Sequence, residues 1–144
     1  MQLTKQTDFA FRTLLYLAHQ PADQLVHIQQ LCDYYQISPN HLSKIVVKLG
    51  HLGYIHTVRG KGGGIALNKA ALKAPLADIV RAFETTLDPV NCEASPCRLL
   101  PNCRLKHVLN DAMHAFMGVL GQYTLQDLLD NDIQVIRKPK RNKS

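Results

Sequence analysis

The stretch ISPNHLSKIVVKLGHLG, residues 37–53, decides how this chain folds. Ser38 suits a helix N-cap, and Pro39 fits the first helical position, where its missing N–H costs no hydrogen bond. Apolar residues then recur at helical spacing and predict one buried stripe, made of Leu42, Ile45, Val46, Leu49 and Leu52. Gly53 ends the predicted helix.

The opposite face of this helix is polar and partly basic; it carries Asn40, His41, Ser43, Lys44, Lys48 and His51. A shorter amphipathic helix is predicted just before it, over residues 27–36, with Ile28, Leu31, Cys32 and Tyr35 on one face. Two helices joined by a tight turn form a helix-turn-helix, whose second helix enters the DNA major groove. In this arrangement Cys32 is a core residue rather than a metal ligand.

A glycine-rich hairpin is predicted directly after the recognition helix. Residues 54–59 are rich in strand formers, and residues 65–67 are predicted to pair with them as a second strand after the loop at 60–64. Glycine permits the positive φ angles that such loops need. Arg59 and Lys61 add charge at the base and tip, so the hairpin is interpreted as a DNA-binding wing.

The charge distribution supports a polyanionic partner. The formal net charge is +6, and no acidic residue occurs between positions 34 and 77. The alternative is a basic but merely solvated surface. The predicted DNA contacts are Ser38, Asn40, His41, Lys44, Lys48, Arg59 and Lys61. Among them Lys44 and Lys48 suit phosphates, whereas Asn40, His41 or Arg59 would read bases.

Three further helices complete a mainly α fold, a winged helix-turn-helix with a two-stranded wing and a long C-terminal dimerisation helix. They are predicted over residues 3–19, 75–84 and 104–123, and Thr124 caps a last short helix. The apolar stripe of the 104–123 helix exceeds what a small domain needs, so a partner helix is expected to cover it. The chain divides into a DNA-binding domain (1–87), a cluster-binding loop (88–103), dimerisation and terminal helices (104–131) and a basic, disordered tail (132–144).

Three cysteines lie in the predicted loop, with four and then five residues between them: Cys92, Cys97 and Cys103. This spacing matches neither paired zinc knuckles nor ferredoxin motifs. It favours an iron-sulfur cluster, 4Fe-4S or 2Fe-2S, with a fourth ligand of another type. Structural zinc bound by three cysteines and inert buried thiols are the alternatives.

Other functional classes fit the sequence poorly. No stretch approaches the roughly 20 apolar residues of a membrane span, and the charged N-terminus is unlike a secretion signal. We therefore expect a cytoplasmic protein without membrane contact, whose thiols stay reduced. An enzyme or electron carrier is the rival class, but no nucleotide-binding glycine motif and no nucleophile-and-base signature is present.

Several motifs together resemble the NsrR family of nitric-oxide-sensitive repressors, which are iron-sulfur winged helix-turn-helix regulators. They are Asp8-Phe9 with Arg12, SPNHL (38–42) with Lys44, VRGKGGG (58–64), VNC (90–92), Cys97 and CRLK (103–106). The resemblance runs from Met1 to about Asp130. It implies a homodimer that represses nitrosative-stress defence genes from a palindromic operator until nitric oxide attacks the cluster.

The resemblance also bears on the cluster ligands. It implies that Asp8 of the partner subunit is the fourth ligand. A related regulator of iron-sulfur cluster assembly has five residues in both cysteine gaps and a histidine three positions after the last cysteine. This chain has Lys106 there, which favours the nitric-oxide sensor over that regulator or another redox- or iron-responsive member.

Overall fold

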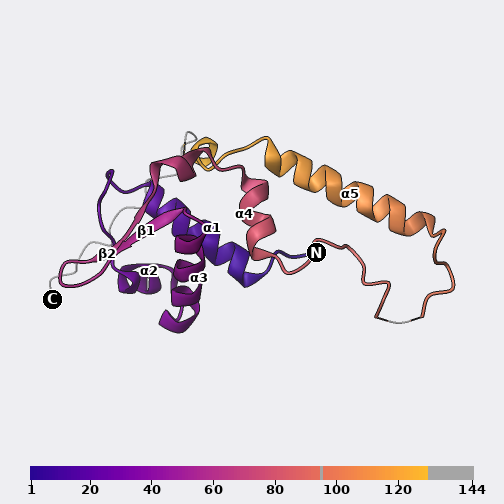
Figure 1. Cartoon of the computed structure of the whole chain (residues 1–144), viewed down its shortest axis with the longest axis horizontal. Helices are drawn as coiled ribbons and strands as arrows, with labels where there is room; N and C mark the ends of the chain where they lie inside the picture. Colours follow the sequence, from indigo (N-terminus) through magenta and orange to yellow (C-terminus); the bar gives the residue numbers. More distant parts are fainter. Residues whose placement is uncertain (95, 130–144) are drawn as a thin grey trace.

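The computed structural model describes residues 1–94 and 96–129. Helices α1 to α4 and a hairpin form one body, from which α5 extends (Figure 1). The elements are α1 (Lys5–Ala18), α2 (Ile28–Tyr35), α3 (Pro39–His51), β1 (Ile55–Val58), β2 (Gly64–Leu67), η1 (Lys69–Lys73), α4 (Leu76–Phe83), α5 (Arg104–Gly121) and η2 (Gln126–Leu128). The predicted mainly helical fold with a two-stranded wing is confirmed.

The helix-turn-helix forms where the sequence predicted it. After α2 the chain turns at Gln36, whose φ is 55°, and the Ser38 hydroxyl then caps α3 by accepting a hydrogen bond from the His41 amide at 3.4 Å. The first four residues of the predicted stripe are buried. The prediction for Leu52 is wrong: this side chain is 42% exposed, because it follows the last helical turn as the C-cap.

The wing is an antiparallel hairpin in which Ile55 lies opposite Leu67 and Val58 lies opposite Gly64. Gly64 therefore begins β2, although the sequence analysis placed it in the loop. Val26, from the segment before α2, forms a bridge to Ile65 through two 2.9 Å hydrogen bonds. A Cβ on Gly64 would lie 2.7 Å from the Val26 carbonyl oxygen, so this crossing requires glycine. The sequence did not predict the bridge.

Helices α1 and α4 enclose the core. α1 begins two residues later than predicted because Thr4 caps it, which leaves Leu3 outside the helix and 39% exposed. α4 buries the four predicted side chains, Leu76, Ile79, Val80 and Phe83. Both helices pack against each other, and α1 also packs against α3, so a single hydrophobic core links the helix-turn-helix to α4.

α5 is held to this body by a small part of its surface. Met117 is buried against Ala77 and Val80 of α4, and Met113 packs beside it. The sequence did not single out these methionines. By contrast, Leu105 and Val108 from the predicted stripe are 62% and 61% exposed. Phe116 and Leu120 from the same stripe pack against the body, so the predicted apolar face of α5 is uncovered within one chain mainly toward its N-terminal end.

The chain after α5 folds back onto the start of α4. Thr124 pairs with Pro75, and the Leu76 amide donates to the Tyr123 carbonyl at 2.9 Å. Thr124 also exchanges hydrogen bonds with Asp127. The predicted capping residue is nevertheless wrong by one position, because the N-cap of η2 is Leu125. The end of the 104–131 segment and the 132–144 tail lie outside the described residues. Among residues 1–94 and 96–129, no helix has the length and apolar character to cross a membrane.

Candidate functional site

The exposed face of α3 and the wing form one basic surface. All seven predicted DNA contacts lie on it and are exposed. The hairpin projects beyond the helices, with α3 on the same part of the body (Figure 1). Because positions 34–77 contain no acidic residue, this surface has a one-signed field that suits phosphates.

Lys48 differs from the other basic residues of this surface. Its ammonium nitrogen lies 4.8 Å from the centroid of the Phe83 ring, and Phe83 is the buried end of α4. A cation over an aromatic face is attracted by the ring quadrupole. Lys48 therefore ties α3 to α4 as well as facing solvent, a contact that the sequence did not indicate.

A side-chain network fixes the base of the wing. The Asn68 amide group donates to the Gly53 carbonyl at 2.7 Å, and its oxygen lies 2.7 Å from Nδ1 of His56. Gly53 follows α3, and His56 is on β1, so Asn68 joins the recognition helix to the hairpin. Asn68 was missed because an asparagine after a strand is an ordinary turn residue in a sequence.

The three loop cysteines lie on the segment between α4 and α5. All are free; Cys97 is exposed, and Cys92 and Cys103 are half-buried. Cys32 is also free but buried in the core, as expected. In the described part of the chain, no three histidine, cysteine or acidic side chains are grouped closely enough to hold a metal ion. The structure of one chain does not draw the three thiols together.

Local hydrogen bonds shape the loop around its first and last cysteine. Asn91 Oδ1 accepts from the amides of Glu93 and Ala94, each at 3.1 Å, which forms a turn around Cys92. Cys92 also lines a hollow of about 320 Å³ together with Asp88 and Lys106. Cys103 is the N-cap of α5 but makes no side-chain capping bond there. A thiolate at this position would face the positive end of the helix dipole.

Asp8, the predicted fourth ligand, lies in the first turn of α1. Its carboxylate forms a two-point ion pair with Arg12, with both N–O distances at 2.9 Å. The Arg12 guanidinium lies 5.7 Å from the centroid of the Tyr35 ring, and the Tyr35 hydroxyl donates to the Arg12 carbonyl at 3.1 Å. Burial, followed by the neighbouring Tyr34, raises the pKa of Tyr35 to about 12, so this hydroxyl remains a donor at neutral pH. Asp8 is thus connected through Arg12 to the end of α2.

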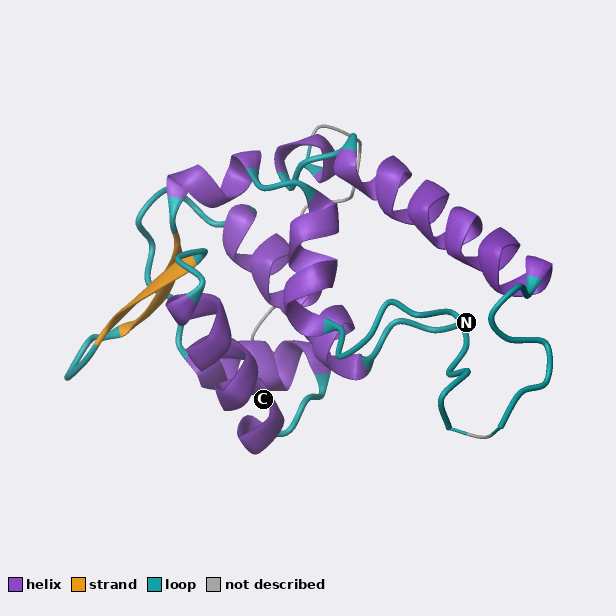
Figure 2. Cartoon of the chain, turned by 45° about the vertical axis from the view of Figure 1, so that its right-hand side comes forward, coloured by secondary structure: helices purple, strands orange, loops and turns teal. Residues whose placement is uncertain are grey.

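Glu84 joins the start of α1 to the end of α4. Its Oε1 accepts hydrogen bonds from the Thr4 amide at 2.8 Å, from the Thr4 hydroxyl at 3.0 Å and from the Thr7 hydroxyl at 2.5 Å. Burial raises the pKa of this carboxyl, but the bonds from Thr7 and Thr4 outweigh it and hold the pKa below its ordinary value. The segment that leads to the cysteines therefore leaves α4 beside the N-terminus of α1, as both views show (Figures 1 and 2).

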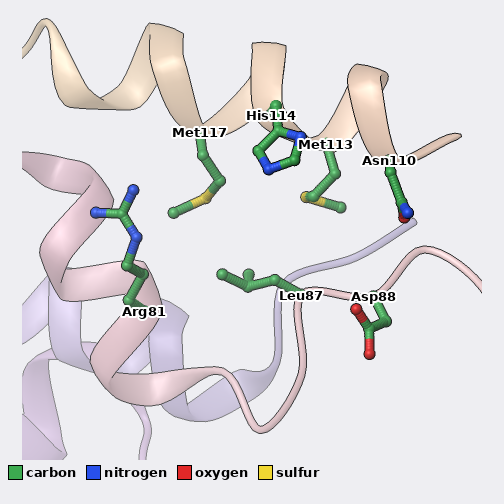
Figure 3. Close-up of a pocket in the computed structure, with 7 residues that line it drawn as sticks. All are labelled: Arg81, Leu87, Asp88, Asn110, Met113, His114 and Met117. Carbon is green, nitrogen blue, oxygen red and sulfur yellow. The ribbon is translucent and has the colours of Figure 1, made fainter. Parts of the chain in front are cut away.

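An open hollow lies between the middle of α5 and this segment. It has a volume of about 360 Å³, and Met113, His114 and Met117 point from α5 toward Leu87 across it (Figure 3). Asp88 lies at its edge (Figure 3). The N-terminal half of α5 consequently makes little apolar contact with its own body, in agreement with the exposure of Leu105 and Val108.

Comparison with known proteins assigns the chain to a family. Residues 3–131 match the Rrf2 family, described as iron-dependent transcriptional regulators. The chain belongs to the Rrf2 family. It is 46% identical to the HTH-type transcriptional regulator NsrR of Halalkalibacterium halodurans over 97% of this chain and 99% of that one. It is 45% identical to NsrR of Bacillus licheniformis over 91% and 94%.

Solved structures support the fold of this Rrf2 chain. The oxidised form of CymR from Staphylococcus aureus superposes with a TM-score of 0.73 at 21% identity, covering 91% of this chain and 98% of that one. Membership of Rrf2 makes the protein a transcriptional regulator rather than an enzyme. It also supports a role for iron, although the type of iron centre stays a prediction.

The thiol groups of the three loop cysteines are chemically suited to bind an iron-sulfur cluster. Three free thiols lie on the segment between α4 and α5. Thiolates are the usual ligands of such clusters.

Proposed function

We propose that this protein is a nitric-oxide-responsive repressor that binds DNA as a homodimer in the cytoplasm. The observation that carries the proposal is the set of three free cysteines between α4 and α5 in a chain closely similar to regulators named NsrR. In the proposal Cys92, Cys97 and Cys103 hold an iron-sulfur cluster, and Asp8 of the partner subunit completes it. When bound, such a cluster offers iron to which nitric oxide binds.

The DNA-binding part of the proposal uses the α3 and wing surface. Two recognition helices of a dimer would enter successive major grooves about 34 Å apart on a palindromic operator. Lys44 and Lys48 would contact phosphates, and Asn40, His41 and Arg59 would read bases, with Ser38 and Lys61 at the edges of the contact. Repression then depends on the spacing between the two recognition helices.

Asp8 is the residue through which nitric oxide binding would change the spacing between the two recognition helices. While it serves as a ligand, Asp8 ties α1 of one subunit to the cysteine loop of the other. After release, its carboxylate is available for the two-point pair with Arg12. Arg12 contacts Tyr35 at the end of α2. A shift of Arg12 on pairing with Asp8 would therefore act next to the turn before α3. A carboxylate binds iron less strongly than a thiolate does, so it is the ligand most easily exchanged.

The test is a nitric oxide titration of protein purified without oxygen, with visible absorption and DNA affinity recorded on the same sample. We expect a brown chromophore that bleaches while affinity for the operator falls. Asp8→Ala should alter the chromophore and weaken operator binding even before nitric oxide is added, whereas Arg12→Ala should leave the chromophore intact. A colourless protein containing zinc, or one whose DNA affinity is indifferent to nitric oxide, overturns the proposal.

A further inference from the structure

Val47 occupies an unexpected place on the recognition helix. Its side chain is 59% exposed, more than any other large hydrophobic side chain in residues 2–87. It lies two residues from both Ile45 and Leu49, and so about 200° around the helix from these buried residues. Val47 therefore points directly away from the core.

The neighbours of Val47 on this face are the polar residues already assigned to DNA. Asn40, Lys44, Val47 and His51 follow one another at spacings of four, three and four residues, so they form one row along α3. A single exposed valine is ordinary on a protein surface. This one lies in the middle of a polar row, where a β-branched side chain lowers helix propensity and gains no packing within the chain.

Gly50 shows the same pattern on the adjoining part of the face. A Cβ at Gly50 would meet nothing within 4 Å, and its φ is not positive, so neither packing nor backbone conformation calls for glycine there. Glycine within a helix is nonetheless destabilising relative to alanine. Because Gly50 has no side chain, another molecule can approach the surface of α3 more closely at this point than it could at any other residue type.

The positive charge around this face of α3 favours nucleic acid as the molecule that approaches it. The surface is exposed, lacks acidic residues between positions 34 and 77, and is flanked by the basic wing. In the major groove, the apolar group that a base presents is the C5-methyl of thymine. A valine at the centre of a helix lying in that groove matches this methyl group.

Building on the proposed function, we propose that Val47 determines specificity by contacting the methyl group of a thymine in each half-site, and that Gly50 allows α3 to approach the DNA closely enough for this contact. Val47 touches only the base methyl. Asn40 and Lys44, on the same row, supply hydrogen bonds and charge.

The test combines a change in the protein with a change in the DNA. The full-length protein first selects duplexes from a random pool, and each thymine of the selected site is then replaced singly by deoxyuridine, which lacks the methyl. At one thymine per half-site, we expect wild-type affinity to fall about fourfold, the worth of one buried methyl. The Val47→Ala protein should bind the thymine and deoxyuridine duplexes equally at that position.

Two glycine variants test the approach of the helix. Gly50→Ala should raise the melting temperature through better helix propensity and yet weaken DNA binding. Gly118→Ala is the matched control, because Gly118 is also a helical glycine with open space around its Cβ position and lies in α5. It should raise the melting temperature with DNA affinity unchanged.

The outcomes separate this inference from the proposed function. If the wild-type protein selects a sequence but Val47→Ala keeps its full sensitivity to the thymine methyl, the role of Val47 is overturned and the repressor function stands. If Gly50→Ala binds DNA as tightly as the wild type, the close approach is overturned. If the wild-type protein selects no sequence, the DNA-binding function fails and the inference fails with it.

Discussion

Lys48 illustrates how one side chain can serve both the fold and its partner. Its contact with the Phe83 ring is worth about 0.5–1 kcal/mol at a partly exposed site. Lys48→Met retains most of the alkyl chain and removes the charge, so we expect the free energy of unfolding to fall by about that amount. Lys44→Met, on the open face of α3, should change it by less than about 0.5 kcal/mol.

Chemical denaturation at one fixed protein concentration measures both variants, and the salt dependence of DNA affinity measures their contacts with phosphate. Each lysine that binds a phosphate should lower the slope by about one when it is removed. Equal stability of the two variants would contradict the structural role of Lys48.

Glu84 gives the protein an acid-sensitive joint between α1 and α4. Its pKa is lowered in the folded chain from an ordinary 4.5. The stabilisation is therefore fully present above pH 4.5 and is lost as the pH falls through the lowered value. At pH 7 we expect Glu84→Gln to be about 1 kcal/mol less stable than the wild type, because the hydrogen bonds lose their charged acceptor.

Urea unfolding at a series of pH values tests this joint. The difference between wild type and Glu84→Gln should shrink below pH 4.5. Asp78→Asn is the control, since it breaks only an exposed ion pair with Arg81, of a kind that contributes little to stability. A difference that stays constant from pH 7 to pH 3 would argue against Glu84 as the source.

At the scale of elements, the hairpin and α3 behave as one unit because Asn68 joins them. Asn68→Ala removes the bonds to Gly53 and His56 and should lower the free energy of unfolding by about 1 kcal/mol. We also expect weaker DNA binding, since the wing loses its fixed angle to α3. His56→Ala removes only one of these bonds and should have the smaller effect on melting temperature in differential scanning calorimetry.

Elements were more predictable from the sequence than the contacts between them. Ser38 and Pro39 set the start of α3, and the glycines around Lys61 set the hairpin, because caps and turns depend on neighbouring residues. The bridge from Val26 to Ile65 joins distant segments and left no local pattern. The three cysteines could be identified as candidate ligands, but their approach to one another depends on a bound group and on a second subunit, which no spacing encodes.

At the scale of the whole molecule, α5 determines the oligomeric state that we expect. Its uncovered row includes Leu105, Val108 and Val119, the last 55% exposed. Val108→Glu would place a charge in a covered interface and should convert a dimer to the 16.2 kDa monomer. Light scattering after size exclusion measures the mass. His107→Glu, one residue away on the exposed polar side, should remain dimeric; a monomeric wild type would contradict the prediction.

The uncapped start of α5 has a thermodynamic consequence. Cys103 ends the loop and begins the helix without a side-chain bond of its own. Any group that holds its sulfur also anchors the first turn, so metal affinity and helix fraying are linked quantities. This coupling is reciprocal. If a bound metal stabilises the first turn of α5, then a change that unfolds this turn weakens metal binding by the same free energy. A dimer partner that stiffens α5 therefore raises the affinity of the loop for iron beyond what its own ligand contributes.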